Sequence, residues 1–264
     1  MRLTPLSLAL WSLCAVGTAD ALTPSAGRGG VVPPRGAEGS SVLLYDQTDN
    51  AASNGVPDQD FEAAFDIYDS EAADDFVVPA GAGWLVDEIR TVGTTGTAGG
   101  ATVDVVFYSN SAGGGDPDLP GAPVAGCTYN ALTPVDSAGS FTISLPTACN
   151  LPAGTYWVSV QTNQSFTTNG QHFWSNRSVQ TGSESVWRNP GGGFATTVPC
   201  TSFRPQTACG VGGGLSPDLL FQVWGTQAST AAPVAAPTMD RYGLVLMGLL
   251  LAAVAGFSLT RRDS

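Results

Sequence analysis

Apolar and polar residues alternate with a period of two along much of the middle of the chain. The alternation is plainest in 103–108, 141–145 and 156–160, where β-branched and aromatic residues return at every second position. A strand places successive side chains on opposite faces of a sheet, so this pattern predicts β-strands with one apolar face. Nine strands are predicted in this way, at 42–45, 75–78, 84–92, 103–108, 141–145, 156–160, 171–174, 185–188 and 219–224.

Glycine and proline separate these strands, as in Gly113–Gly115 and Pro190–Gly193, and the chain holds 33 Gly and 18 Pro among 264 residues. Many short strands divided by such turns predict an all-β fold, an antiparallel β-sandwich of jelly-roll type. One short helix is expected at 60–68. There Phe61, Ala64, Phe65 and Tyr68 follow the i, i+3, i+4, i+7 spacing of a helix face.

The first 21 residues have the pattern of a signal peptide. Arg2 supplies the positive start, an apolar stretch follows, and Ala19-Asp20-Ala21 fits the cleavage site, so the mature chain is expected to begin at Leu22. A flexible segment at 22–39 and an Ala/Pro linker at 227–236 have too few large apolar residues to form a core. They bound an ectodomain predicted at 40–226, which has the size of one domain.

The C-terminal part contains a predicted transmembrane helix at 242–260. This segment has no charged residue, and 19 residues at 1.5 Å each reach about 28 Å, close to the thickness of a bilayer core. Arg261 and Arg262 follow it directly, which by the positive-inside rule places the C-terminus in the cytoplasm. The ectodomain is therefore expected outside the inner membrane.

The segments on either side of this helix contain Pro237, Thr238, Tyr242, Gly243, Arg261 and Arg262. Together with the apolar span, these residues resemble the IPTL-CTERM (PEP-CTERM-like) sorting tail of bacterial envelope proteins. The resemblance implies that an exosortase-like membrane protease recognises the tail, and that the anchored protein then reaches the cell surface or the medium. The alternative is an ordinary single-helix anchor. Residues 40–78 and 187–194 also resemble uncharacterised exported β-sandwich domains, which implies no particular activity.

Four cysteines remain after signal cleavage: Cys127, Cys149, Cys200 and Cys209. An even number of cysteines in an exported chain predicts disulfides, because that compartment is oxidising. Three pairings are possible, and proximity along the chain favours Cys127 with Cys149 and Cys200 with Cys209. A metal site is the weaker interpretation, since no C-x-x-C occurs.

Charge excludes several classes of function. The chain has no Lys and a single His, His172, and residues 22–239 hold 19 acidic residues against six Arg. Lysine-based chemistry is therefore excluded. Nucleic acid is not expected as a partner, because phosphate binding needs a basic surface.

Thirteen of the acidic residues lie between Glu38 and Glu88. They allow a Ca²⁺ site, since calcium prefers several carboxylate and carbonyl oxygens. The candidate ligands are Asp46, Asp49, Asp58, Asp60, Asp74 and Asp75. No D-x-D-x-D-G spacing is present, so a solvated acidic face is the favoured alternative. No other cofactor is expected.

Four aromatic residues suggest a second kind of site: Trp157, Trp174, Trp187 and Phe194. Exposed rings on a sandwich would suit stacking against sugars, which makes carbohydrate the expected ligand class. The alternative, which we favour for these residues, is that large aromatic side chains close the ends of the core.

An enzyme is the competing class of function. Its best version is a glycosidase-like hydrolase with two carboxylates, Glu88 and one of the upstream aspartates. A serine hydrolase would require His172, but no G-x-S-x-G is present. No catalytic residue is therefore assigned, and the sequence favours a non-catalytic binding or structural protein of the bacterial envelope.

Overall fold

The computed structural model describes residues 40–111, 118–214 and 216–229. The predicted signal peptide, the segment 22–39, most of the linker and the whole sorting tail lie outside this range. Within it, no helix is both long enough and apolar enough to cross a membrane. The helix predicted at 242–260 is not among the described residues.

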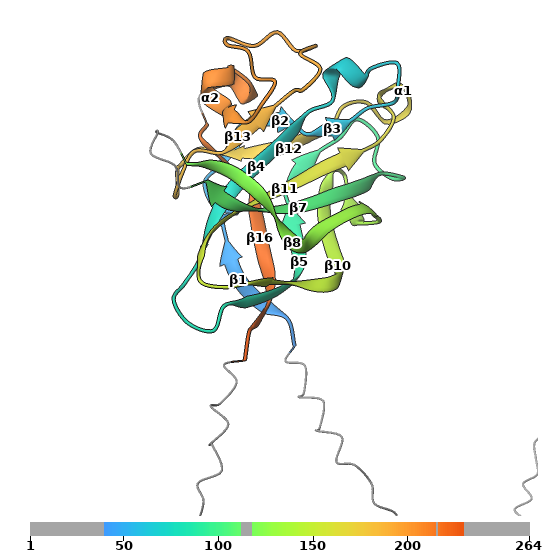
Figure 1. Ribbon diagram of the computed structural model, residues 1–264. Helices are drawn as coiled ribbons and strands as arrows, with labels where there is room; N and C mark the ends of the chain where they lie inside the picture. Colours follow the sequence, from blue (N-terminus) through green and yellow to red (C-terminus); the bar gives the residue numbers. More distant parts are fainter. Residues whose placement is uncertain (1–39, 112–117, 215, 230–264) are drawn as a thin grey trace, which may run out of the picture. The chain divides into compact units, whose positions relative to one another are not determined.

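The prediction of an all-β fold is confirmed, because antiparallel sheets make up most of the described chain (Figure 1). The strands are β1 Val42–Asp46, β2 Ala51–Pro57, β3 Gln59–Asp60, β4 Glu71–Val78, β5 Trp84–Thr91, β6 Gly93–Thr94, β7 Thr102–Ser111, β8 Leu119–Leu132, β9 Val135–Ser137, β10 Ser140–Leu151, β11 Gly154–Asn163, β12 Phe173–Arg177, β13 Val186–Arg188, β14 Arg204–Pro205, β15 Asp218–Leu219 and β16 Phe221–Gln227. The described helices are short: α1 Phe166–Asn169, α2 Gln206–Cys209, and 3₁₀ turns at Asp66–Tyr68 and Gly212–Gly214.

The strands form three sheets. The first has the order β1-β16-β5-β10-β9, and the second has the order β14-β13-β4-β11-β7-β8, with β3 added parallel to β11. The third is smaller, with β12 between β15 and β2 and with β6 also paired to β12. Each of the nine predicted strands overlaps an observed one. The long strands β2 and β8 and the short strands β3, β6, β9 and β14 are not among the predicted ones.

The main hydrophobic core lies between the first two sheets. Val105 and Phe107 of β7 contribute to it from the second sheet, and Ile89 and Val223 contribute from the first; all four are fully buried. Their burial follows the period-two alternation of the sequence, because each strand turns its apolar face inward. Each Å² of apolar area removed from water stabilises the folded state by about 25 cal/mol, so this layer is the principal source of the stability of the fold.

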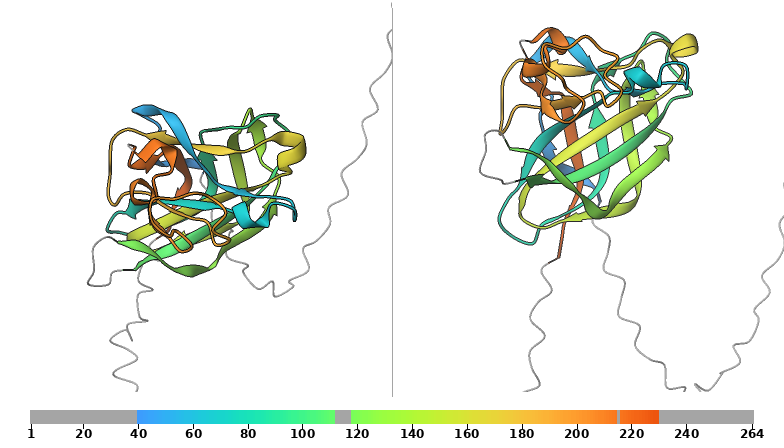
Figure 2. Two further views of the ribbon diagram at one scale, coloured as in Figure 1. Left: turned by 90° about the horizontal axis from the view of Figure 1, so that it is seen from above. Right: turned by 45° about the horizontal axis from the view of Figure 1, so that its top comes forward.

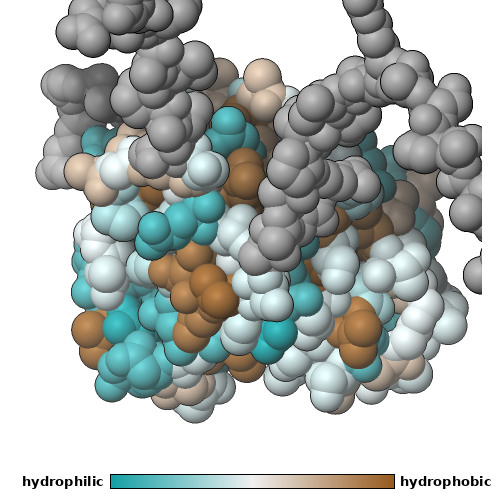
Figure 3. Space-filling view, turned by 90° about the horizontal axis from the view of Figure 1, so that it is seen from below, coloured by the Kyte–Doolittle hydropathy of each residue, from teal (hydrophilic) through white to brown (hydrophobic). Residues whose placement is uncertain are grey.

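A smaller apolar cluster lies on another part of the second sheet. Ala73, Tyr108, Trp157 and Val186 are buried there, and Phe203 packs against them. Strand β4 is therefore buried over almost its whole length rather than on alternate residues. Elsewhere on the surface, the face drawn in Figure 3 carries apolar residues in separate patches between polar ones.

The four cysteines form the two local disulfides that sequence proximity favours. Cys127 of β8 is bonded to Cys149 of β10, and Cys200 is bonded to Cys209 of α2. The first bond joins the second sheet to the first. The second bond fixes α2 to the loop that follows β13.

The prediction of a helix at 60–68 is wrong. Asp60 ends β3, and only Asp66–Tyr68 form a single 3₁₀ turn. The backbone N–H of Phe61 donates to the Asp69 side chain at 2.9 Å. Side-chain bonds to the backbone thus hold the segment as a loop, in competition with a helix.

Candidate functional site

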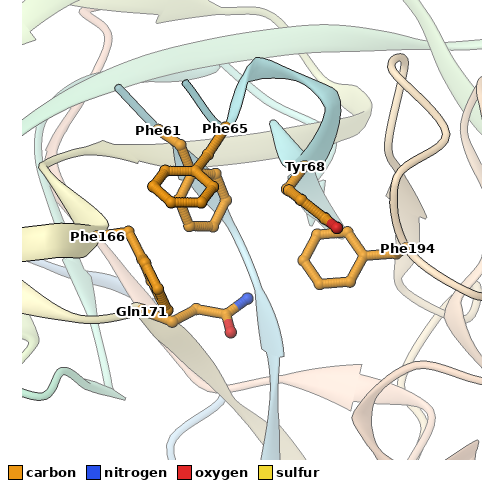
Figure 4. Close-up of a pocket in the computed structure, with 6 residues that line it drawn as sticks. All are labelled: Phe61, Phe65, Tyr68, Phe166, Gln171 and Phe194. Carbon is orange, nitrogen blue, oxygen red and sulfur yellow. The ribbon is translucent and has the colours of Figure 1, made fainter. Parts of the chain in front are cut away.

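The described part of the chain has an aromatic pocket at the end of the molecule where α1 and the 61–68 loop meet. Its cavity measures about 290 Å³, and it is lined by Phe61, Phe65, Tyr68, Phe166, Gln171 and Phe194. Three loops supply these residues: the one between β3 and β4, the one between β11 and β12, and the one after β13. Figures 1 and 2 show the 66–68 turn beside α1, and Figure 4 shows the six side chains around the cavity.

Glu62 holds one wall of the pocket in place. Its carboxylate accepts hydrogen bonds from the backbone N–H of Phe166 at 2.6 Å and of Thr167 at 3.0 Å, and from the Thr167 hydroxyl at 2.6 Å. These bonds, with the Thr167 hydroxyl first among them, lower the pKa of Glu62 to about 2. Ser165 caps the same short helix by accepting from the N–H of Thr168. The N-terminal turn of α1 is thereby fixed next to the 61–68 loop.

The fixed turn positions Phe166 against the other loop. The ring of Phe166 lies 5.4 Å from that of Phe65 in an edge-to-face arrangement, and 6.1 Å from that of Phe61. Its side chain is 43% exposed. Large aromatic side chains usually bury more of their surface, so an exposed ring at the mouth of a cavity is available to a ligand.

Asn189 holds the opposite wall. Its side-chain amide donates to the carbonyls of Ile67 and Asp69, both at 2.8 Å, and its side-chain oxygen accepts from the N–H of Phe194 at 3.0 Å. The N–H of Gly193 also donates to the Ile67 carbonyl at 2.8 Å. Asn189 is buried, so these bonds join two segments that lie far apart in the sequence.

Two of the three glycines after Pro190, Gly191 and Gly193, are explained by this contact with Ile67. A Cβ atom on Gly193 would lie 2.6 Å from the Ile67 carbonyl oxygen, which is closer than real Cβ contacts. Glycine therefore allows the two backbones to approach each other. The approach places the Phe194 ring edge-to-face with Tyr68, at a centroid distance of 5.3 Å.

Two further hollows adjoin the aromatic pocket. One, of about 210 Å³, shares Phe61 and is otherwise polar, with Asp60, Glu62, Asn163, Gln164 and Ser165. The other, of about 420 Å³, shares Phe194 and is lined by Asn189, Gly192, Ala195, Thr196, Thr197, Val198, Pro199, Cys200 and Thr201. We call the three hollows together the aromatic groove. No Arg or His is among its lining residues.

The tryptophans named in the sequence analysis belong to the interior. Trp157, Trp174 and Trp187 are fully buried. Their indole N–H groups donate to Asn110 Oδ1, the Leu220 carbonyl and the Pro57 carbonyl respectively. The favoured interpretation of these rings as core residues is confirmed. Of the four aromatic candidates, only Phe194 lines the groove.

The acidic residues named as calcium candidates do not converge. Among the described residues, no group of three or more His, Cys, Asp and Glu side chains is arranged to hold a metal ion. Asp49 pairs with Arg177 at 2.8 Å, and Asp60 lines the polar hollow. The favoured alternative of a solvated face is wrong for three of them, because Asp58, Asp74 and Asp75 are buried.

Asp74 and Asp75 lie close to a third buried carboxylate, Asp218. Burial raises the pKa of Asp74 well above its usual value, with a further rise from the charge of Asp218. Burial likewise raises the pKa of Asp75 and that of Asp218 to about 7. The backbone N–H groups of Ser183 and Thr181 donate to Asp75 and Asp218 at 3.0 and 2.6 Å. These two carboxylates therefore hold the 178–185 loop on the sheet.

His172 forms a second buried polar group. Its Nδ1 lies 2.6 Å from Asp58 Oδ1, and its Nε2 lies 2.8 Å from the Gly139 carbonyl oxygen. Burial lowers its pKa, but the charge and hydrogen bond of Asp58 outweigh this effect, so the pKa of His172 is raised. The side chain is 1% exposed and is stacked on Phe141. It therefore has a structural role in the described chain.

Glu88, the candidate acid of a hydrolase, lies on β5. Its carboxylate accepts from Arg90 Nε at 2.7 Å, and the Arg90 guanidinium lies over the Trp224 ring. Glu88 lines none of the three hollows.

Comparisons of the chain with protein-family models, with curated proteins and with solved structures gave no match.

Proposed function

We propose that the protein is an exported, non-catalytic binding protein of the bacterial envelope, and that its ectodomain binds carbohydrate in the aromatic groove. The observation that carries the proposal is the pocket with five aromatic rings and one amide, Gln171. A sugar ring has an apolar face, which stacks on aromatic rings, and a polar edge, which needs hydrogen-bonding partners.

The two flanking hollows support an extended ligand rather than a single sugar. One offers the carboxylate and amide groups around Asn163 and Gln164, and the other offers the threonine hydroxyls at 196, 197 and 201. Because Phe61 and Phe194 are each shared with the central pocket, a chain of sugar units can occupy the groove while its central unit stacks on the rings.

The distribution of acids favours binding over catalysis. The six residues of the central pocket include no carboxylate, His or Cys. In the adjacent polar hollow, Glu62 already accepts bonds from α1, and its pKa is lowered to about 2. A general acid needs a raised pKa, so Glu62 is unsuited to the acid role in glycoside hydrolysis. Asp60 in the same hollow has a raised pKa, but the one other carboxylate that lines the groove, Glu62, is bonded to α1, so the groove offers no second free carboxylate for the two-carboxylate mechanism. The alternative function remains a hydrolase of that type, and turnover of a chromogenic glycoside would establish it.

Export and sorting complete the proposal. The disulfides fit an oxidising compartment, and the two sheets with a shared core fit a β-sandwich, which we propose to be jelly-roll-like. We further propose that an exosortase-like membrane protease recognises the tail at Pro237, Thr238, Tyr242, Gly243, Arg261 and Arg262. The protein would then pass from the inner membrane to the cell surface or the medium.

A glycan array with the purified full chain tests the binding function. A polyoxyethylene detergent should be used, because a glycoside detergent would compete for a sugar site. We expect selective binding whose affinity falls by about five- to 150-fold in Tyr68→Ala, since the loss of one stacking contact on an aromatic ring costs about 1–3 kcal/mol by analogy with the stacking of nucleic-acid bases. The control is Val135→Ala, because Val135 is 73% exposed and lies on β9, outside the groove. Absence of binding across a broad array would refute the proposal.

A further inference from the structure

The groove has an uneven charge, and the imbalance bears on which carbohydrate it accepts. Asp60 and Glu62 line the polar hollow, and no basic side chain lines any of the three hollows. An anionic sugar would find no counter-charge there and would be repelled. A ligand with positive charge would instead be attracted, and several aromatic rings next to acidic groups are a favourable environment for an ammonium group.

Asp60 is the acid in this hollow whose charge is available. It is exposed, and no hydrogen bond to its carboxylate is found within the described residues. By contrast, Glu62 accepts from the backbone of α1. Partial desolvation of its carboxyl group, and then the negative charges of Asp69, Asp104 and Asp66, raise the pKa of Asp60. Neighbouring acids thus disfavour the ionised form, and a cation placed beside Asp60 would relieve this repulsion.

The position of Asp60 next to the rings links the charge to the sugar site. It is followed by Phe61, which lines both the polar hollow and the aromatic pocket. A sugar unit that stacks on Phe61 in the pocket is therefore bordered by the hollow that Asp60 lines, and its neighbouring units or substituents have room to enter that hollow.

We infer that the ligand of the groove is an amino-sugar chain with free, protonated amines, bound through stacking on the aromatic rings and through an ion pair between Asp60 and a ligand ammonium. This inference rests on the proposed carbohydrate-binding function and names the class of glycan. An N-acetylated chain keeps the same backbone but loses the positive charge. We therefore expect the groove to bind the chain with free amines more tightly than the acetylated chain.

Three tetrasaccharides with the same β-1,4 linkage isolate the effect of the ligand's positive charge on binding. They carry an amine, an acetamide or a hydroxyl at C2, as oligomers of glucosamine, N-acetylglucosamine and glucose. Isothermal titration calorimetry would be run on the full chain in polyoxyethylene detergent at pH 6, where sugar amines are protonated. We expect the glucosamine oligomer to bind at least tenfold more tightly than the other two in low salt, and this preference to shrink as salt is raised.

Variants then assign the effect to Asp60. Asp60→Asn should weaken the glucosamine oligomer by about three- to fivefold, within the range for an exposed ion pair, and leave the two neutral oligomers unchanged. Asp60→Glu should restore most of the affinity. Asp118→Asn is the matched control, because it removes one negative charge from an exposed residue that lines none of the hollows.

The outcomes separate this inference from the function on which it rests. Equal binding of the three oligomers, or tighter binding of a neutral one, overturns the amino-sugar inference and leaves carbohydrate binding in place. A glucosamine preference that Asp60→Asn does not reduce overturns the role of Asp60. If none of the three oligomers binds, the amino-sugar inference is overturned, and the glycan array alone decides the broader function.

Discussion

The buried carboxylates predict an unusual dependence of stability on pH. The pKa of Asp75 is raised from 3.8 to about 7 in the folded chain, and that of Asp218 is raised to about the same value. The folded state therefore holds these protons more tightly than the unfolded state does. Their contribution to stability is complete below about pH 3.8 and is lost as the pH rises through 7.

The size of the effect follows from the width of this window. One pKa unit corresponds to about 1.4 kcal/mol, and Asp75 alone stays more protonated in the folded state over most of the range from pH 5 to 7. We therefore expect the free energy of unfolding to fall by about 2–3 kcal/mol between pH 5 and pH 8 through this residue. For a domain of this size, the melting temperature should fall by roughly 5–10 °C.

The variant Asp75→Asn gives the sharpest assay. Asparagine has the shape of the protonated acid and keeps an oxygen that accepts from the Ser183 N–H. The melting temperature of the Asp75→Asn variant, measured by differential scanning calorimetry, should match that of the wild type at pH 5 and exceed it at pH 8. Asp66→Asn is the control, since Asp66 is exposed and its substitution makes the same change in charge. A wild-type melting temperature that is constant or rises from pH 5 to pH 8 would refute the reasoning.

Three further predictions concern other parts of the molecule. Peptide mapping without reduction should recover the bond between Cys127 and Cys149, and its reduction should cost about 2–4 kcal/mol of unfolding free energy; four free thiols in envelope-derived protein would contradict this. Gly193→Ala should lower both the melting temperature and glycan binding, because its Cβ would lie 2.6 Å from the Ile67 oxygen; unchanged binding would show that the Phe194 wall is dispensable. Removal of residues 237–264 should turn a membrane-associated protein into a soluble exported one with the same calorimetric transition, and full-length protein found in the medium with its C-terminus intact would refute both the anchor and the sorting.

The sequence predicts strands well where one face is apolar. The alternation in β7 and β10 is strong because each of these strands covers the core with about every second residue. Strand β11 alternates in sequence as well, although four consecutive residues of it, 157–160, are buried. Strand β8 has no such signal, since Pro and Gly interrupt it. It is a strand because β7 offers a partner, and that pairing is a property of the tertiary structure.

The site was only partly predictable for a related reason. Phe194 is a candidate for sugar stacking because it lies near a loop, but the sequence favours core packing for it as for the three tryptophans. The spacing of Phe61, Phe65 and Tyr68 indicates correctly that they share a side, although the helix is absent. Their partner Phe166 lies about a hundred residues further along the chain, and no local pattern connects the two segments.

The burial of the acidic residues depends on similarly distant contacts. Asp74 accepts from Gln47 Nε2 at 2.8 Å and from the Leu219 N–H at 2.7 Å. Gln47 lies 27 residues before Asp74 within the acidic stretch, and Leu219 lies 145 residues after it. No local pattern points to either contact, so the sequence favours a solvated face. Buried polar groups are paired in folded proteins, but the sequence does not say with which residue.

The irregular strand β8 also affects how copies of the protein meet one another. It is the last strand of its sheet, and its register against β7 shifts at three places. Its Pro120 and Pro123 have no backbone N–H to donate, and Cys127 ties it to β10. A neighbouring extended chain therefore finds no long, regular row of donors and acceptors on this edge. Two copies that meet at this edge are therefore not expected to pair into a continuous intermolecular sheet.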